Sequence, residues 1–560
     1  MRKVFKIAVT GDVHGMLYPY DFTTLSPAPG SLARVSAYVK DLRSRIGENH
    51  VLLLDNGDIL QGQPPVYFYN FIETGVTHPV ARMLKHMRYD AQTVGNHDIE
   101  TGHPVYDRYR ADLSPIPLLG ANVNDTANDE PYFKPYTIIE RDGVRFAVLG
   151  LLTPAIPAWL PEELWSGMDV TDMVESARRW VEHIRRHEQP DMVIGLFHSG
   201  YESTHLTGKW LENASGLVAR EVEGIDLIFM GHDHLRAVRR ESTGILLLNP
   251  GAHARLVAEA TVTADVAPDG RVAILDVDGD LVRLDSYDPD PAFLTEFEPE
   301  RMRTLQLVGQ VIGEAAGEFS GRDVYFGPSA FMELIHTLQL EVSGADISLA
   351  SPTSFDATLH KGPLRISDMF TLYRYENQLC TLSMTGREIK NHLEMSYNLW
   401  TAVMHSPDDP LLKFSTGNHI KGDYTFLINP SYNFDSAYGI VYEVDVTQLQ
   451  GNKIHIISMA DGSPFDPDKT YRVAVNAYRA NGGGELLTRG AGIPSDQLKN
   501  RIIHTTPLDL RYYLMEAIKR KGTITPTVTP NWKFVPEHLT AKAIIRDRER
   551  LFPQYDIPQS

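Results

Sequence analysis

The chain has 560 residues, of which 42% are hydrophobic and 22% are charged, a composition that excludes disordered and collagen-like sequences. Its formal net charge of −19 argues against broad binding to nucleic-acid polymers or anionic membranes, and no apolar run reaches the roughly 18–20 residues needed to cross a bilayer. The single cysteine, Cys380, excludes an internal disulfide and a cysteine-ligated metal cluster.

The first predicted strand lies close to the N-terminus and resembles no secretory signal. Lys6 interrupts its apolar run, and Gly11 and Asp12 follow directly after it. We therefore expect a cytoplasmic protein. A periplasmic or extracellular location is the alternative, if a signal has been trimmed.

The first 280 residues repeat one pattern, in which an apolar run is followed by a polar or glycine-rich turn and often by an amphipathic helix. Strands are predicted at Val4–Thr10, Val51–Asp55, Ala91–Val94, Met192–Phe197 and Leu227–Met230. A helix is predicted from Met173 to Ile184, with Asp172 as its N-cap. Strands this apolar are buried on both faces, as in a sheet that helices cover.

The pattern changes after a turn-rich stretch at Tyr287–Pro291, which a predicted helix over about Arg301–Phe319 follows. Beyond it, helices are predicted at Ser329–Leu340 and before Tyr373, and strands at Asp346–Ala350, Leu379–Met384, Ile440–Val446, Ile454–Ser458 and Tyr471–Asn476. The sequence thus predicts two α/β domains, residues 1–287 and 320–560, joined by a linker helix within residues 288–319.

Polar residues follow all five predicted strands of the first domain. They are Asp12 and His14, Asp58, Asn96 and His97, His198, and His232 and His234. Open α/β sheets build their sites at the carboxyl ends of strands. Carboxylate, imidazole and amide groups suit a divalent cation, and a bridging carboxylate can hold two cations about 3.5–4 Å apart. A single Gly-Asp turn or a single His198 would more often be structural, so the hypothesis rests on the joint order of the five blocks.

That order, Asp-x-His, Gly-Asp, Gly-Asn-His, His and Gly-His-x-His, resembles the calcineurin-like metallophosphoesterases over about residues 3–285. The motifs Tyr432-Asn433-Phe434-Asp435 and Tyr478-Arg479-Ala480-Asn481-Gly482-Gly483 resemble the two-domain 5′-nucleotidase family. They look most like its bacterial branch of 2′,3′-cyclic-nucleotide 2′-phosphodiesterases/3′-nucleotidases. The resemblance implies a four-layer α/β/β/α sandwich followed by a 5′-nucleotidase C-terminal substrate-binding domain.

The resemblance also implies two divalent metal ions, for which Mn, Zn, Co and Fe are candidates. The implied ligands are Asp12, His14, Asp58 and His234 for the first ion, and Asp58, Asn96, His198 and His232 for the second. His97 stands in the place of the family's catalytic histidine. Its orienting Asp is replaced by Glu100, and Asn96 would help to neutralise charge during catalysis.

In the second domain, the resemblance implies that Phe434 and Tyr478 sandwich a nucleobase. The other implied substrate-binding residues are Asn433, Arg479, Gly482 and Gly483. Core packing is the alternative role of the two rings.

The implied activity is a dinuclear-metal phosphohydrolase that opens 2′,3′-cyclic nucleotides and dephosphorylates 3′-nucleotides to nucleosides. A 5′-nucleotidase or nucleotide-sugar pyrophosphatase is the alternative. The arginines expected of that branch are replaced by Ser351-Pro352-Thr353-Ser354, and an expected carboxylate by Gly484. Both departures favour the cyclic-phosphodiester branch.

Two further alternatives are a thiosulfohydrolase, which would leave the base-binding motifs without a purpose, and a non-catalytic metal-binding adhesion module, which the complete ligand set disfavours. The expected partners are small nucleotides, with no nucleic-acid polymer, no membrane and a monomeric chain.

Overall fold

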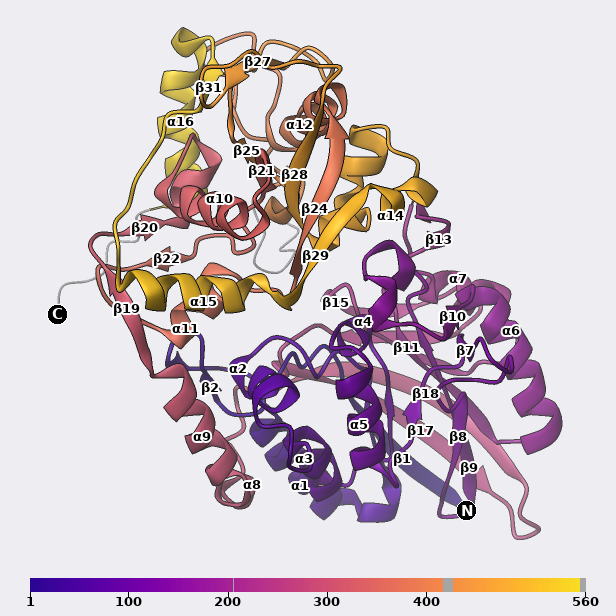
Figure 1. Ribbon diagram of the computed structural model, residues 1–560. Coiled ribbons are helices and arrows are strands. Elements are labelled where there is room, and N and C mark those ends of the chain that lie inside the picture. Colours follow the sequence, from indigo (N-terminus) through magenta and orange to yellow (C-terminus); the bar gives the residue numbers. More distant parts are fainter. Residues whose placement is uncertain (205, 416–426, 554–560) are drawn as a thin grey trace. The chain divides into compact units, whose positions relative to one another are not determined.

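The computed structural model describes residues 1–204, 206–415 and 427–553. Its chain divides into two compact units, Met1–Val308 (unit 1) and Gly309–Ser560 (unit 2), each with sheets and helices of its own (Figure 1). Within the described ranges, no helix combines the length and apolar character that crossing a membrane requires.

Unit 1 contains two six-stranded mixed sheets (Figure 1). In spatial order, the first holds β18 (Val272–Arg283), β17 (Leu256–Val266), β1 (Arg2–Thr10), β4 (Val51–Asp55), β5 (Ala91–Thr93) and β6 (Leu118–Leu119). The second holds β15 (Arg236–Arg240), β16 (Leu246–Pro250), β14 (Leu227–Met230), β11 (Met192–His198), β9 (Val144–Leu152) and β8 (Tyr136–Arg141). The five strands predicted for this domain are confirmed as β1, β4, β5, β11 and β14.

Short strands also pair in twos within unit 1. The pairs are β2 (Tyr20–Asp21) with β3 (Ser26–Pro27), β7 (Val123–Asp125) with β10 (Met168–Val170), and β12 (Leu206–Thr207) with β13 (Trp210–Leu211).

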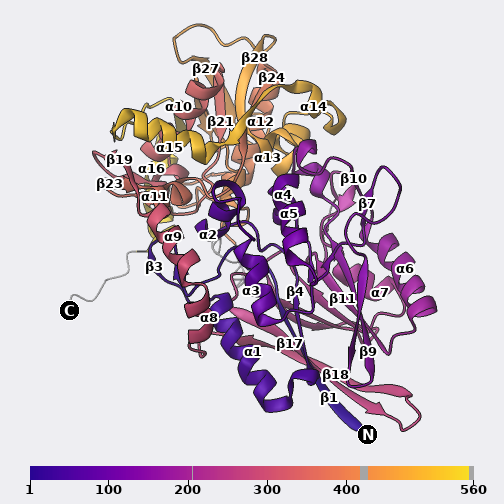
Figure 2. The ribbon, with the colours of Figure 1, turned by 60° about the horizontal axis from the view of Figure 1, so that its bottom comes forward.

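Helices cover the outer face of each sheet. The first sheet packs against α1 (Leu32–Ile46), α3 (Pro79–Met87) and α5 (His103–Leu113), and the second against α6 (Met173–His183) and α7 (Ser215–Glu221) (Figure 2). The predicted N-cap is present, because Asp172 Oδ1 accepts hydrogen bonds from the backbone N–H groups of Val174 and Glu175 at 2.8 and 3.0 Å. Shorter helices are α2 (Pro64–Tyr67) and α4 (Asn96–Glu100).

The alternation of side chains along β4 shows how the layers are held. Val51 and Leu53 pack in the cluster that includes the helices, whereas Leu52 and Leu54 pack between the two sheets. Since successive strand residues point to opposite faces, a strand that is apolar throughout suits a layer covered on both sides. The covering layers are helices on one side and the other sheet on the opposite side, which confirms the predicted four-layer α/β/β/α sandwich.

The predicted linker helix is wrong in its second half. The helices here are α8 (Pro291–Glu296) and α9 (Glu298–Val308), and the chain then forms the strand β19 (Val311–Ala315). Gly309 follows the last helical residue, and Val311 and Ile312 favour a strand. Residues 298–308 therefore form the helix α9, and residues 311–315 pair with two strands of unit 2.

Unit 2 is a second α/β domain, as predicted. Its five-stranded sheet holds, in spatial order, β25 (Ser436–Tyr438), β21 (Ile347–Ala350), β28 (Thr470–Asn476), β24 (Gln378–Thr385) and β29 (Ile502–Asp509). Two three-stranded sheets consist of β27 (Ile454–Met459), β26 (Ile440–Asp445) and β31 (Trp532–Val535), and of β23 (Gly362–Arg365), β19 and β30 (Thr523–Ile524). A short pair joins β20 (Phe319–Ser320) to β22 (Thr358–Leu359).

The helices of unit 2 pack against these sheets. They are α10 (Ala330–Ser343), α11 (Ile366–Leu372), α12 (Gly386–Trp400), α13 (Ala477–Ala480), α14 (Leu498–Arg501), α15 (Leu510–Lys521) and α16 (Glu537–Leu551). α10 contacts β21, β24, β25 and β28, and α12 contacts β24, β25 and β27. The predicted elements from Ser329 to Asn476 are thus present, with ends that shift by at most three residues.

Candidate active site

The polar residues predicted as metal ligands meet where strands of the two sheets of unit 1 end. β1 pairs in parallel with β4, and β4 with β5, so the loops after these strands leave the first sheet at one edge. β11 and β14 are also parallel neighbours in the second sheet. Carboxyl ends of parallel strands share an edge, which explains why residues far apart in sequence gather here.

Two groups of side chains have the geometry of metal sites. Asp12, His14 and His234 form the first group, and Asp58, His198 and His232 form the second. Within each group, the candidate ligand atoms lie within 4.8 Å of one another. The structure therefore brings together six of the seven predicted ligands in two sets of three.

The seventh predicted ligand, Asn96, lies in the second group. Its Oδ1 is 3.1 Å from Nε2 of His198 and 2.8 Å from Nδ1 of His232. The groups are adjacent, since the backbone N–H of His232 donates to both carboxylate oxygens of Asp12 at 3.0 and 3.1 Å. The bridging role of Asp58 stays a prediction.

Several of these residues adopt a left-handed backbone, which side chains other than glycine rarely take. The φ angles are 50° at Asp12, 48° at His14, 54° at Asp58, 71° at His232 and 57° at His234. Such conformations cost on the order of 1–3 kcal/mol each and persist where the surrounding structure imposes them. One such restraint is the hydrogen bond from the backbone N–H of His14 to the carbonyl of Asp58, at 2.9 Å. The concentration of left-handed residues at this edge of the sheets marks it as a candidate functional site.

Three of the predicted histidine ligands each have one ring nitrogen beside an oxygen outside the group. Nδ1 of His14 lies 3.2 Å from the carbonyl of Gln61, and Nδ1 of His198 lies 2.6 Å from the carbonyl of Asn56. Nε2 of His232 lies 3.0 Å from Oε1 of Glu212. Carbonyl and carboxylate oxygens accept, so each neutral ring donates outward and keeps a lone pair on its inward nitrogen.

The inward nitrogens face other acceptors. Nε2 of His198 lies 3.1 Å from Oδ2 of Asp58, a buried oxygen that receives no hydrogen bond. Nε2 of His14 lies 2.9 Å from Nε2 of His234. Where both atoms of such a pair carry lone pairs, they repel one another unless a proton or a cation lies between them. The donor set therefore fits divalent ions of the kind that imidazole and carboxylate ligands bind.

The burial of the two carboxylates also indicates a site for positive ions. Asp12 and Asp58 are both fully buried. Burial raises the pKa of Asp12 well above its ordinary value. Although burial alone would do the same to Asp58, the positive charges of His198 and His97, when these rings are protonated, hold the pKa of Asp58 well below its usual range. Two buried carboxylates in adjacent groups need positive charge nearby, which metal ions would supply.

His97 and Glu100 form the pair expected of a catalytic histidine and its orienting carboxylate. Nδ1 of His97 lies 2.5 Å from Oε2 of Glu100, one turn along α4. The backbone N–H of His97 donates to Oδ1 of Asp58 at 2.8 Å, which ties this turn to the second group. The longer side chain of Glu100 therefore reaches the ring, and Nε2 of His97 is left for a reacting group.

The sequence analysis missed Asp98, which holds the same loops in place. Its carboxylate accepts backbone hydrogen bonds from Asp58, Ile59, Leu60 and Gly95 at 2.8–3.0 Å. A signal was present, because Asp98 is the third residue of α4, a position at which carboxylates commonly cap a helix. Gly95 is also required, since a Cβ there would lie 2.1 Å from Oδ1 of Asp58.

In unit 2, Arg479 does not have the predicted substrate-binding role. The residue is 2% exposed. Nε and one terminal nitrogen donate to the two oxygens of Asp435 at 2.9 and 2.8 Å. The terminal nitrogens also donate to Oδ1 of Asn433 at 3.2 Å, to the carbonyl of Tyr432 at 3.0 Å, and to the carbonyl of Gly483. All five N–H donors of a guanidinium are thus accounted for, and Arg479 joins the two motif loops to each other.

Asp435 takes part in this buried network of hydrogen bonds. Although burial opposes its charge, Arg479 and His392 hold the pKa of Asp435 below its usual range. The Oδ1 of Asn433, predicted to bind substrate, likewise accepts from Arg479.

Phe434 is also a correction, because it is a core residue. Its side chain is 1% exposed and stacks on Trp400 with a centroid distance of 5.4 Å and an interplanar angle of 6°. The ring that meets Tyr478 is Tyr432, edge-on at 6.3 Å, and both tyrosines are partly exposed. Tyr432, in the same motif, is therefore the partly exposed ring of that motif that lies beside Tyr478.

The glycines of the second motif shape the loop beside Tyr478. A Cβ on Gly483 would lie 2.4 Å from the Tyr478 ring, and one on Gly484 would lie 2.1 Å from Oδ1 of Asn433. Gly482 and Gly484 have φ angles of 105° and 68°. Crowding and backbone conformation explain why Gly484 stands where a carboxylate was expected.

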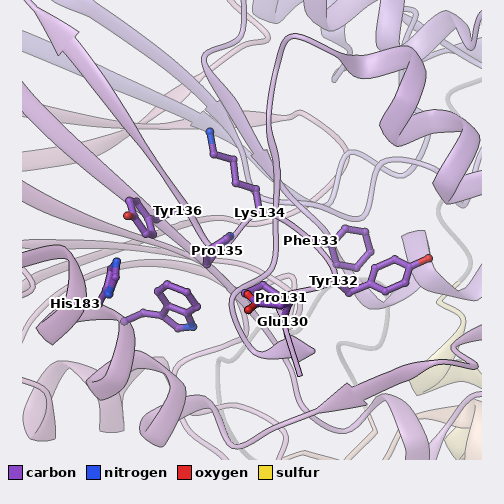
Figure 3. A pocket seen from close by; sticks show the side chains of 9 residues that line it. Glu130, Pro131, Tyr132, Phe133, Lys134, Pro135, Tyr136 and His183 are labelled. Atoms are coloured by element: carbon purple, nitrogen blue, oxygen red, sulfur yellow. The ribbon is translucent and has the colours of Figure 1, made fainter. Parts of the chain in front are cut away.

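A separate pocket of about 410 Å³ lies on unit 1 (Figure 3). It is lined by residues Glu130 to Tyr136, Trp180 and His183. None of the lining residues is one of the predicted ligands. The two Asp–His groups at the strand ends of unit 1 therefore remain the candidate active site.

Comparisons with known proteins identify both units. The sequence matches the calcineurin-like phosphoesterase family over residues 5–236 and the 5′-nucleotidase C-terminal domain over residues 311–489. It is 25% identical over 95% of its length to the trifunctional nucleotide phosphoesterase YfkN of Bacillus subtilis, of which it spans 39%. It is 24% identical over 95% of its length to a Haemophilus influenzae 2′,3′-cyclic-nucleotide 2′-phosphodiesterase/3′-nucleotidase, of which it covers 87%.

The fold is also found in a solved structure. A Staphylococcus aureus protein assigned as a 5′-nucleotidase superposes with a TM-score of 0.79 at 20% identity, over 95% of this chain and all of that one. The resemblance stated from the sequence motifs is thus confirmed, and the protein is a metal-dependent phosphoric ester hydrolase. The chain belongs to the calcineurin-like phosphoesterases that carry a 5′-nucleotidase C-terminal domain.

Proposed function

We propose that the protein is a dinuclear-metal phosphohydrolase of nucleotides that opens 2′,3′-cyclic nucleotides and dephosphorylates the resulting 3′-nucleotides. One observation carries the proposal: two adjacent Asp–His groups direct their inward lone pairs toward common points at the strand ends of unit 1. The relatives named as cyclic-nucleotide phosphodiesterases and nucleotidases support the substrate class.

The two groups divide the ligands between two divalent ions. Asp12, His14 and His234 would hold one ion, and Asn96, His198 and His232 the other, with Asp58 shared between them. When bound, such ions lower the pKa of water and neutralise charge on a phosphoryl group. Mn, Zn, Co and Fe all suit a donor set of imidazole, carboxylate and amide groups.

In the first reaction, water attacks phosphorus and the bond from phosphorus to the ribose O2′ breaks, which leaves a 3′-nucleotide. In the second, the bond to O3′ breaks and releases phosphate and a nucleoside. Each departing oxygen needs a proton. Protonated His97, held through Nδ1 by Glu100, donates it from Nε2.

We further propose that Tyr432 and Tyr478 of unit 2 contact the nucleobase, in place of the pair predicted from the sequence. Partly exposed aromatic faces stack on any base. The segment Ser351-Pro352-Thr353-Ser354 stands where 5′-nucleotidases were expected to carry arginines. Two of its hydroxyl groups donate hydrogen bonds to backbone carbonyls instead. Ser351 donates to the carbonyl of Tyr432 at 2.7 Å, and Ser354 to that of Thr371 at 3.0 Å. This supports the cyclic-phosphodiester branch.

A substrate panel tests the proposal. The protein, loaded with Mn²⁺, would be given 2′,3′-cyclic AMP, 3′-AMP, 5′-AMP and UDP-glucose, while phosphate and nucleoside release are followed. Hydrolysis of the first two in preference to the others is expected. Preference for 5′-AMP or UDP-glucose would instead assign the 5′-nucleotidase or pyrophosphatase activity, and the metal-stripped protein is the control.

A further inference from the structure

We infer that Glu212 is a positioning residue for His232, and that it thereby sets the affinity of the second group for its metal ion. Oε1 of Glu212 lies 3.0 Å from Nε2 of His232, and its Oε2 accepts from Oγ1 of Thr207 at 3.1 Å. The side chains of Glu212 and His232 are 32% and 10% exposed, so the bond is partly shielded from water. This inference rests on the two-metal centre proposed above.

Glu212 belongs to a segment that is fastened to the loop of another predicted ligand. Glu212 lies between β11 and α7, directly after β13. The Oγ of Ser199 donates to the carbonyl of Glu212 at 3.2 Å and accepts from the backbone N–H of Ala214 at 3.1 Å. The backbone N–H of Gly200 donates to Oδ1 of Asn213 at 2.6 Å. The position of Glu212 is therefore tied to the residues that follow His198.

His232 is held on its face as well as on its edge. Trp159 stacks on the imidazole with a centroid distance of 5.5 Å and an interplanar angle of 26°. With Nε2 donating to Glu212, the lone pair of the neutral ring lies on Nδ1, which is 2.8 Å from Oδ1 of Asn96. Glu212 thus selects the tautomer that can act as a ligand, and Trp159 limits the rotation of the ring.

The chemistry of the partner distinguishes His232 from two other histidines of the centre. His14 and His198 donate to backbone carbonyls, whereas His232 donates to a carboxylate. A carboxylate pulls the N–H proton more strongly than a carbonyl does, and so it makes the opposite nitrogen a better electron donor. Removing Glu212 should therefore lower the metal affinity of the second group and leave that of the first group unchanged.

Metal titration of the metal-free protein tests this inference. Mn²⁺ would be titrated calorimetrically into the wild-type protein and into Glu212→Ala and Glu212→Gln. We expect the affinity for one equivalent to fall by about 10–100-fold in Glu212→Ala, with the other equivalent unchanged. Glu212→Gln should lose less, because its amide oxygen can still accept from Nε2 of His232 while the negative charge is gone.

Glu202→Ala is the matched control. Glu202 lies in the same segment and pairs with Arg220 at 2.9 Å on the surface, so its removal should leave both affinities unchanged. Wild-type affinity in Glu212→Ala, or an equal loss of both equivalents, would overturn the inference, since the residue would then be dispensable or would support the whole fold. If the wild-type protein itself binds fewer than two equivalents, the two-metal proposal fails first and the inference falls with it.

Discussion

Replacing Tyr432 by Ala should weaken nucleotide binding and leave the fold intact. Its ring is partly exposed and lies edge-on to the rings of Tyr375 and Tyr478, at centroid distances of 6.5 and 6.3 Å, rather than in the buried core. Stacking of a base on an aromatic side chain is worth about 1–3 kcal/mol. Since about 1.4 kcal/mol is a factor of ten, KM for 2′,3′-cyclic AMP should rise by about 5- to 150-fold.

The neighbouring Phe434→Ala should behave in the opposite way. The Phe434 ring is 1% exposed and lies flat against Trp400, so its removal leaves a cavity in the core of unit 2. Such truncations cost about 3–5 kcal/mol of unfolding free energy. The fraction that remains folded should keep a near-normal KM for the nucleotide.

Two measurements separate the roles of these rings. KM would be determined for 2′,3′-cyclic AMP and for bis-p-nitrophenyl phosphate, which carries no base, and stability would be determined by urea unfolding. Tyr432→Ala should affect the nucleotide much more than the aryl ester. A stable Phe434→Ala with a raised nucleotide KM, together with an unaffected Tyr432→Ala, would refute the assignment and restore the pair predicted from the sequence.

Four further substitutions probe the two units. Asp58→Ala should abolish turnover and reduce bound metal by more than one equivalent, because a shared ligand serves both ions; two full equivalents by metal analysis would contradict this. His97→Asn should lower kcat for 3′-AMP by roughly 10²–10⁴-fold with metal content intact, and should lower it less for p-nitrophenyl phosphate, whose leaving group needs no proton. Glu100→Gln should show the same dependence in milder form, and an equal loss on both substrates would exclude proton donation. Arg479→Met should lower the unfolding free energy by about 3–5 kcal/mol, because Asp435 would stay buried without its guanidinium partner, and denaturant unfolding would detect this.

The sequence by itself determined the strands and the chemistry at their ends. Each ligand block follows an apolar run directly, as Asp12 follows β1 and His232 follows β14, so local pattern and strand order suffice to predict one edge. The helix α6 and its Asp172 cap were predictable for the same reason, because the contacts that define them lie within a few residues. His97 and Glu100 are one helical turn apart, so their pairing also follows from local spacing.

Only the tertiary structure decided which residues meet across long separations. Glu212 reaches His232 because the segment after β11 folds back, and nothing in its local sequence indicates that return. Tyr432 lies in a short 3₁₀ turn (Ser431–Asn433) and Phe434 directly follows it, and the packing of Trp400 decides which ring is buried. The sequence motif implies that Arg479 binds substrate, whereas its five N–H donors hold the two motif loops together. Such choices depend on which side chain fills a given volume, which a pattern along the chain does not encode.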